Sequence, residues 1–190
     1  VRLLKRISAD SVLVSIEHRG NIGLYRLNVE TGQRSTIISE GQFASIRDFW
    51  VIDDGKALIF SAETGDHDGH YRVDLNTGEL RALMEVQLAS RSNYEVFGSQ
   101  IFTVYHSYAL IMQSGLVSSD WITSLYRLNI ETDEYDLLVS DTDFGVGGVD
   151  SYPPTNGRDV LLFPFRDDGT STGHLRIDME TGDTTWINVG

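Results

Sequence analysis

One nine-residue pattern occurs four times along the chain. The copies span residues 24–32, 70–78, 125–133 and 174–182, and each has Arg at its third position and Asn or Asp at its fifth. The four arginines are residues 26, 72, 127 and 176, so successive copies are 46, 55 and 49 residues apart. Self-similarity at a period of about 50 residues predicts an architecture in which each repeat forms one supersecondary unit.

Each copy is typical of a β-strand followed by a hairpin turn. In the first copy, Tyr25 and Leu27 alternate with Arg26, which is the two-residue period of a strand with two unlike faces. The copy ends in Glu-Thr-Gly, which places Gly32 where a tight turn needs a positive φ. Asp133 replaces this glycine in the third copy, and Asp is among the few residues that tolerate the same conformation.

Three more strands are predicted in each repeat. One short strand follows each turn, at residues 35–39, 80–84, 135–139 and 184–189. Two strands precede each copy, at residues 3–7 and 12–16, 43–52 and 56–62, 94–97 and 101–108, and 150–152 and 160–165. Four antiparallel strands per repeat, without helical periodicity, predict an all-β protein, a β-propeller of four four-stranded antiparallel blades. A β-sandwich is the structural alternative, but it does not require near-identical units.

The predicted blades are residues 1–40, 41–86, 87–140 and 141–190, in a single propeller domain or a partial propeller that spans residues 1–190. Four blades form a complete small propeller or part of a larger one with six to eight blades. In the second case, further blades are missing from this chain.

The repeat resembles those of two known groups of propellers. The residues that carry the resemblance are an Asp-Gly turn and apolar strand at 54–60, followed by the strand and turn at 71–78. This pattern is similar to the propeller repeats of the periplasmic protein TolB and to the propeller that covers the active site in prolyl-oligopeptidase-type serine peptidases. The resemblance covers essentially the whole chain and implies a fold rather than a function. It also implies a periplasmic or extracellular bacterial location, although the residues themselves leave the cytoplasm open.

The charge of the chain narrows the choice of partner. The formal net charge is −13 and the pI is about 4.6, so the surface repels nucleic-acid backbones and anionic lipid heads. Basic proteins, peptides, cations and neutral ligands remain open as partners. No apolar run approaches the roughly 18 residues of a membrane span, so we expect no membrane insertion. The chain has no cysteine, which removes disulfides, thiolate zinc sites and cysteine nucleophiles.

The repeated arginines have two interpretations. Each Arg precedes an Asn or Asp by two residues, so both lie on one face of their strand. A ring of arginines lining a channel would bind anions, whereas a ladder from Arg to Asn or Asp would brace neighbouring blades. The ladder is the favoured interpretation, because these residues repeat together with the fold.

No catalytic residues are predicted. The chain has no Gly-x-Ser-x-Gly segment, and in the peptidases that it resembles catalysis belongs to a separate hydrolase domain. A lyase or hydrolase that uses the propeller channel has no residue signature here. No cofactor is predicted either. Ca²⁺ at Asp66 and Asp68 is the alternative, but an Asp- and Gly-rich turn accounts for the same residues without a metal.

The longest connections are the candidate binding regions. Segments 63–69, 113–123 and 167–173, together with the interblade segments 40–44, 85–93 and 140–149, are predicted to be loops at one end of the propeller. The candidate partner-binding residues in them are Asp66, Asp68, Asp120, Trp121, Asp141, Asp143 and Phe144. Trp121 either anchors a ligand or packs against its own blade.

These observations support two functions. The first is a non-catalytic binding or scaffolding propeller that recognises a protein, peptide or cationic ligand through its acidic long-loop end. The alternative is a propeller domain that gates substrate access in a prolyl-oligopeptidase-type serine peptidase whose hydrolase domain is absent from this chain.

Overall fold

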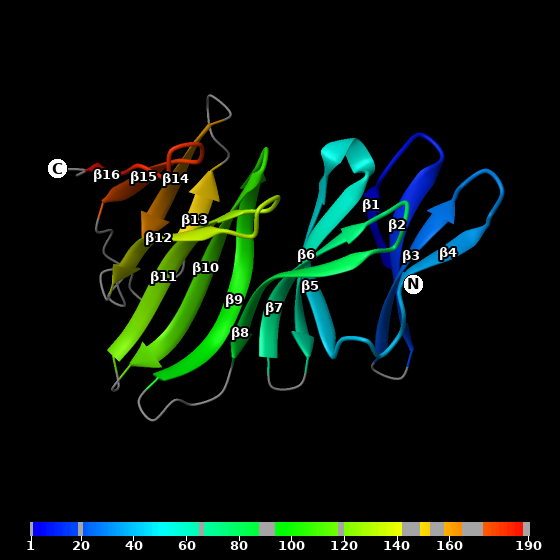
Figure 1. Ribbon diagram of the computed structural model, residues 1–190, viewed down its shortest axis with the longest axis horizontal. Coiled ribbons are helices and arrows are strands. Elements are labelled where there is room, and N and C mark those ends of the chain that lie inside the picture. Colours follow the sequence, from blue (N-terminus) through cyan, green and yellow to red (C-terminus); the bar gives the residue numbers. More distant parts are fainter. Residues whose placement is uncertain are drawn as a thin grey trace. The chain divides into compact units, whose positions relative to one another are not determined.

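The described residues form four antiparallel sheets (Figure 1). The computed structural model describes residues 2–18, 21–64, 67–87, 94–117, 120–141, 149–152, 158–164 and 173–187. Each sheet has four strands that follow one another in chain order, so every connection joins neighbouring strands. We call the sheets blades 1 to 4. The chain divides into two compact units, Val1–Gln87 and Leu88–Gly190.

The first unit contains blades 1 and 2. The strands of blade 1 are β1 (Arg2–Arg6), β2 (Ser11–His18), β3 (Asn21–Asn28) and β4 (Arg34–Ile38). Those of blade 2 are β5 (Ser45–Ile52), β6 (Ala57–Thr64), β7 (His67–Asp74) and β8 (Leu80–Gln87). The Asp-Gly turn between β5 and β6 is a single 3-10 turn, η1 (Asp53–Gly55).

The second unit contains blades 3 and 4. The strands of blade 3 are β9 (Tyr94–Tyr105), β10 (Tyr108–Val117), β11 (Asp120–Asn129) and β12 (Tyr135–Asp141). Those of blade 4 are β13 (Val149–Tyr152), β14 (Asp159–Pro164), β15 (His174–Asp178) and β16 (Thr184–Ile187). The prediction of four four-stranded antiparallel sheets is therefore confirmed.

The repeated turns have one common hydrogen-bonding pattern. In blade 1, Gly32 has a φ of 70° and donates its N–H to the carbonyl of Asn28 at 2.9 Å. The Asn28 side-chain oxygen accepts hydrogen bonds from the N–H groups of Glu30 at 3.0 Å and Thr31 at 2.9 Å. Asp74, Asn129 and Asp178 accept the equivalent bonds in the other blades. A side chain that bonds to the backbone two and three residues on stabilises this turn, which explains the Asn or Asp at the fifth repeat position.

The two faces of a blade differ in their repeat positions. One face carries the residues equivalent to Leu24 and Arg26, and we call it the Arg face. The other carries the residues equivalent to Tyr25, Leu27 and Val29, and we call it the Tyr face. Strand alternation separates the two sets.

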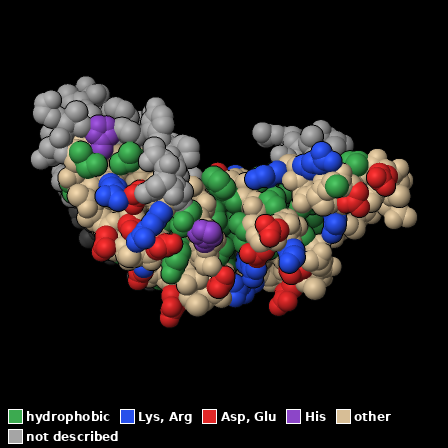
Figure 2. All heavy atoms as spheres, turned by 90° about the horizontal axis from the view of Figure 1, so that it is seen from above, with side chains coloured by type: hydrophobic (Ala, Val, Ile, Leu, Met, Phe, Trp, Pro, Cys, Tyr) green, Lys and Arg blue, Asp and Glu red, His purple; other side chains and the backbone are tan. Residues whose placement is uncertain are grey.

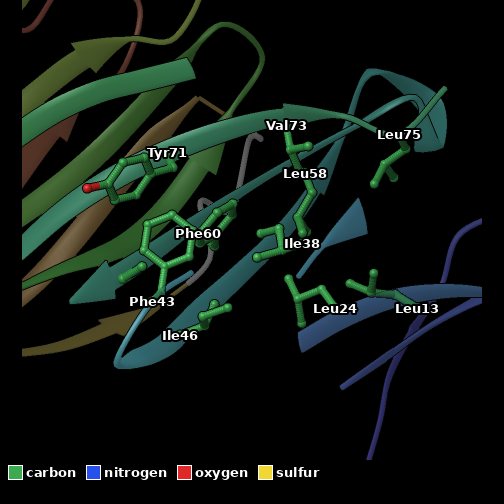
Figure 3. Packing of buried hydrophobic residues seen from close by; sticks show 11 residues of the cluster. Leu13, Leu24, Ile38, Phe43, Ile46, Leu58, Phe60, Tyr71, Val73 and Leu75 are labelled. Carbon is green, nitrogen blue, oxygen red and sulfur yellow. The ribbon is translucent and has the colours of Figure 1, made fainter. Parts of the chain in front are cut away.

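In the first unit, the Arg face of blade 1 packs against the Tyr face of blade 2. Leu13, Leu24 and Ile38 from blade 1 lie in one buried cluster with Leu58, Phe60 and Tyr71 of blade 2 (Figure 3). The Phe60 and Tyr71 rings stack with their centroids 5.7 Å apart. These aromatic rings exclude a large apolar area from water, which is the dominant favourable contribution to folding.

In the second unit, the same repeat positions form the core. Leu110 and Leu125 from the Arg face of blade 3 pack against the Tyr face of blade 4. The blade 4 residues of this cluster are Val160, Leu162, Leu175, Ile177 and Met179. The two units therefore use one interface type, an Arg face against a Tyr face.

Blade 3 differs from its predicted strands. Strands at 94–97 and 101–108 were expected, but β9 runs without a break to Tyr105 and β10 begins only at Tyr108. The turn between them contains His106, whose φ of 49° lies in the left-handed region. Because this turn has no Gly, Pro, Asn or Asp, its sequence lacks the usual turn signal.

Two predicted loops are strands instead. The described residues of segment 113–123 belong to β10 and β11, which pair from Tyr108 with Asn129 to Val117 with Asp120. Segment 63–69 belongs largely to β6 and β7, which pair as far as Thr64 with His67. The loop prediction for these segments was wrong because polar and glycine residues at the hairpin ends still complete the hydrogen-bonded ladder.

Two Gly→Ala substitutions distinguish the stability cost of a left-handed backbone from the cost of losing a side-chain contact. A Cβ on Gly32 would meet nothing within 4 Å, so Gly32→Ala should cost only the left-handed penalty, about 1 kcal/mol. A Cβ on Gly182 would lie 2.9 Å from Arg127 Cζ and would displace the guanidinium from the Glu180 carbonyl, 2.6 Å away. We therefore expect Gly182→Ala to cost about 1 kcal/mol more than Gly32→Ala in urea denaturation. Equal losses would show that the Arg127 contact does not stabilise the fold.

Candidate functional site

The strand ends opposite the repeated turns form the candidate surface, and we call them the open ends of the blades. At the open end of blade 1, Tyr25 Oη donates a hydrogen bond to Glu40 Oε1 at 2.9 Å, and His18 Nδ1 lies 4.0 Å from Glu40 Oε2. The hydrogen bond to the Glu40 carboxylate is the first cause that raises the pKa of Tyr25 above its usual value. At the open end of blade 2, Ser45 Oγ donates to Glu63 Oε2 at 3.2 Å.

A glycine two residues before the tyrosine makes this arrangement possible. A Cβ on Gly23 would lie 2.8 Å from Tyr25 Oη, and a Cβ on Gly69 would lie 2.8 Å from Tyr71 Oη. Residues two apart share a strand face, so the glycine leaves room for the ring to lie along the strand toward the open end. The Gly-x-Tyr pattern of blades 1 and 2 is a sequence signal that the repeat comparison did not single out.

The hairpin of blade 3 is longer than those of blades 1 and 2. β10 and β11 have 10 residues each, whereas β2, β3, β6 and β7 have 8 each. The hairpins start at equivalent pairs, Ser11 with Asn28 and Tyr108 with Asn129, so the extra pairs are at the open end. Two more residues per strand lengthen the hairpin by about 7 Å.

Four of the predicted site residues lie on the described backbone. Asp68 is on β7 opposite Glu63 of β6, at the open end of blade 2. Asp120 and Trp121 begin β11, on the extended part of the blade 3 hairpin. Asp141 ends β12, opposite Thr123 and at the same end of blade 3. Asp120, Trp121 and Asp141 are thus brought together within the second unit, on strands rather than in long loops.

The other three predicted site residues, Asp66, Asp143 and Phe144, lie outside the described residues. Among the described residues, no group of three or more His, Asp or Glu side chains is arranged to hold a metal ion. No helix in the described part of the chain is long and apolar enough to cross a membrane.

The repeated arginines bind mainly within their own blades, and Arg127 also contacts the next blade. Arg72 donates to Asp53 at 2.6 Å, Arg176 donates to Asp159 at 2.7 Å, and both pairs are contained within one blade. Arg127 donates to Asp136 of its own blade at 2.7 Å and to the Glu180 carbonyl of blade 4 at 2.6 Å. Basic and acidic side chains are correspondingly interspersed on the face seen in Figure 2.

The partners of the repeated arginines differ from the expected ones. The Asn or Asp two residues after each arginine stabilises the repeated turn instead. Asp178 stabilises its turn and also binds an arginine, since it accepts a hydrogen bond from Arg158 at 2.8 Å. That bond is the first cause that lowers the pKa of Asp178 to about 2.

A polar hollow of about 440 Å³ lies near the repeated turn of blade 1. Its lining residues are Asp10, Ser11, Arg26, Asn28, Gln33, Arg34 and Ser35. Asp10 accepts hydrogen bonds from Ser8 at 2.6 Å and from Ser11 at 3.1 Å, and these bonds lower its pKa. Opposite charges line the same hollow, so it has no single ligand charge that it would select.

One serine and one histidine are close together in blade 2. Ser61 Oγ and His70 Nδ1 are hydrogen-bonded at 3.0 Å, and both residues are 0% exposed. Burial lowers the pKa of His70 to about 3, and the positive charge of Arg47 adds to this effect. A serine and a base within hydrogen-bond reach are two parts of a nucleophilic site, but a substrate cannot reach a pair that is fully buried. The pair is therefore structural.

Comparison with known proteins identifies the fold. No protein-family model matches the chain, and no curated protein matches its sequence. The oligogalacturonate lyase of Vibrio parahaemolyticus is similar in structure, with a TM-score of 0.63 and 14% identity over 98% of this chain and 51% of that one. TolB of Acinetobacter baumannii has a TM-score of 0.56 and 14% identity over 98% of this chain and 42% of that one. The β-propeller domain of the Trilobed protease from Pyrococcus furiosus has a TM-score of 0.59 and 11% identity over 98% of this chain and 57% of that one.

The chain thus has the β-propeller fold that its sequence predicts, similar to the folds of TolB and of the protease propeller domain. It spans about half the length of these proteins. Identities this low establish the fold alone.

The buried histidine should make stability depend on pH. The pKa of His70 is about 3 in the folded chain and about 6.5 when unfolded, so below pH 6.5 the unfolded state binds the proton preferentially. Stability should therefore fall by about 2 kcal/mol between pH 7 and pH 5 from this group alone.

His70→Leu is the matched variant, because Leu24 and Leu125 occupy the same repeat position at 0% exposure. Urea denaturation of both proteins at pH 7 and pH 5 measures the difference. The variant should lose less stability than the wild type; equal losses would contradict the assignment of this pH dependence to His70.

Proposed function

We propose that the chain is a non-catalytic binding or scaffolding propeller that recognises a basic protein or peptide, or another cationic ligand, through the open ends of its blades. The observation that carries the proposal is the extended β10–β11 hairpin, whose backbone places the positions of Asp120 and Trp121, with that of Asp141 on β12, at one end of blade 3. An aromatic residue beside carboxylates suits a Lys or Arg side chain, since both groups attract a cation.

The charge of the chain supports a basic partner. The net charge of −13 speeds association with a positively charged partner and opposes binding to nucleic acid or anionic lipid. In the first unit, Glu63 of β6 adds a carboxylate opposite the backbone position of Asp68, and Glu40 adds one at the open end of blade 1. A Ca²⁺ ion at Asp66 and Asp68 is the minor alternative to a basic side chain there.

A role without catalysis fits the burial of the serine–histidine pair in blade 2. Ser61 and His70 are fully buried, and the low pKa of His70 keeps its imidazole neutral inside the blade. The likeness to TolB favours a periplasmic or extracellular location for this binding role.

The second candidate is a propeller domain that gates access to a serine peptidase active site on a hydrolase domain. The structural similarity to the propeller domain of the Trilobed protease favours it. The intact mass of the native polypeptide distinguishes the two candidates. A mass close to 21.2 kDa would contradict the peptidase, and a longer polypeptide with a Gly-x-Ser-x-Gly segment would support it.

Charge neutralisation at the open ends tests the binding role. We expect the combined variant Asp66→Asn, Asp68→Asn, Asp120→Asn, Asp141→Asn and Asp143→Asn to weaken binding of an immobilised Lys/Arg-rich peptide about tenfold or more, with a reduced dependence on salt. Trp121→Ala and Phe144→Ala should each weaken binding without changing the salt dependence, because they remove an apolar contact. Surface plasmon resonance at two salt concentrations measures both effects.

The control neutralises carboxylates near the repeated turns, by Glu30→Gln, Glu79→Gln, Glu131→Gln and Glu134→Gln. This variant loses almost as much charge as the first, so non-specific attraction would weaken similarly in both. Equal losses would contradict a site at the open ends.

A further inference from the structure

Arg26, the repeated arginine of blade 1, differs from its three equivalents in its hydrogen-bond partners. Arg26 donates its Nε–H to the Ser11 hydroxyl at 3.2 Å. Its two terminal nitrogen atoms have no hydrogen-bond acceptor or ion-pair partner among the residues that the structure describes. In each of the other blades this arginine donates to an aspartate carboxylate at 2.6 or 2.7 Å, from Arg72 to Asp53, from Arg127 to Asp136 and from Arg176 to Asp159.

Two serines of blade 1 stand where other blades have the aspartates that bind this arginine. Ser35 of β4 is directly opposite Arg26, as Asp136 is opposite the repeated arginine of blade 3. Ser11 holds the strand position that Asp159 holds in blade 4. A serine hydroxyl is neutral, so neither serine neutralises the guanidinium of Arg26.

The contact that the equivalent arginine makes with a neighbouring turn is also absent among the described residues of the first unit. In the second unit, Arg127 donates to the Glu180 carbonyl at 2.6 Å and lies over Gly182, both in the repeated turn of blade 4. In the first unit, a Cβ on Gly78 in the repeated turn of blade 2 would meet nothing within 4 Å. The guanidinium of Arg26 therefore does not lie over that turn.

Arg26 instead lines the polar hollow of blade 1, whose volume of about 440 Å³ is within the about 300–1,000 Å³ typical of small-molecule sites. Charges of both signs line this hollow, but they differ in how far they are already hydrogen-bonded. The Asp10 carboxylate accepts hydrogen bonds from Ser8 at 2.6 Å, from Ser11 at 3.1 Å and from Asn28 Nδ2 at 3.3 Å. The chain itself thus supplies donors to Asp10, whereas Arg26 has donors left for a ligand.

The other side chains of the hollow add to this difference. The guanidinium of Arg34 lies over the Tyr25 ring, 4.5 Å from its centroid, so this cation already has a partner. The Ser35 hydroxyl and the Gln33 side-chain amide have no hydrogen-bond partner among the described residues. The unused donors of the hollow therefore favour a ligand that accepts hydrogen bonds and carries negative charge.

We propose that Arg26 binds the carboxylate of a small-molecule ligand in this hollow. The planar guanidinium matches a carboxylate, and the three equivalent arginines each bind one within the chain. The net charge of −13 repels an acidic protein or peptide in proportion to its many charges, and it repels a ligand with one carboxylate least. The site goes beyond the proposed partner-binding role, because it lies near the repeated turn of blade 1 and takes a ligand of the opposite charge.

Nuclear magnetic resonance of the arginine side chains tests the proposal, with acetate as the probe. Acetate replaces chloride at constant ionic strength and pH 7, and the Nε–H signal of Arg26 is followed. We expect this signal to shift and to saturate with a Kd of about 1–30 mM, as suits a very small ligand. Arg72 and Arg176 are internal references, because their carboxylate partners are already in place and their signals should not shift.

A carboxylate supplied by the chain should compete with the probe. Ser35→Asp introduces the residue type that blade 3 has at this position, so an ion pair with Arg26 should weaken acetate binding at least about tenfold. Ser35→Asn is the matched control without the charge and should change the Kd less than about threefold. Thr36→Asp adds the same charge on the other face of β4 and should also leave binding nearly unchanged. Ser35 and Thr36 are both exposed, so these variants should fold, which circular dichroism verifies.

The absence of a saturable shift of the Arg26 signal with acetate would overturn the proposal. So would equal losses of binding in Ser35→Asp and Thr36→Asp, which would show general repulsion rather than competition for Arg26. Tighter binding of inorganic phosphate or of a Glu-rich peptide would assign the site to a tetrahedral anion or to an acidic protein, and would also contradict it. None of these results bears on the proposed function, whose site is at the open ends of the blades.

Discussion

Every blade depends on the cover that its two apolar faces receive. In β6, Leu58 and Phe60 point to one face and Ile59 to the other, and all three are fully buried. A single twisted sheet of this kind cannot remain in water, because each exposed face would present a row of large apolar side chains. The repeated pairing of an Arg face with a Tyr face solves this problem, and it explains why the nine-residue pattern is kept while the connections vary.

The blade pattern could be predicted from the sequence because residues that favour tight turns mark the end of each nine-residue copy. Gly32, Gly78 and Gly182 have positive φ values in the three glycine turns, and Asp133 has one in the fourth. Prediction failed in blade 3, where the turn at His106 has no Gly, Pro, Asn or Asp and Gly98 lies inside β9. Strand pairing along the whole hairpin outweighed these local preferences. The preferences of single residues do not include that pairing.

The candidate site was less accessible to sequence reasoning than the fold. The 55-residue spacing before the third repeat is the longest of the three, but the sequence predicted a loop at 113–123 rather than a longer hairpin. The contact between Ser61 and His70 depends on the register of β6 with β7, where these residues are directly opposite. The register of two strands depends on which whole strand faces are buried, so no local sequence motif predicts the contact between Ser61 and His70.

The separation of faces from ends explains how one repeat can serve many functions. Blade faces are committed to packing, and a polar residue there must find a partner inside, as His70 does with Ser61 at 3.0 Å. Strand ends carry no such constraint, so a hairpin can grow by two residue pairs in one blade without disturbing the interfaces. The growth occurs at the open end, since the Asn- or Asp-stabilised turn fixes the other end in all four copies. Differences between the blades therefore accumulate at the end where a partner can reach them, which is the physical reason to look for specificity there.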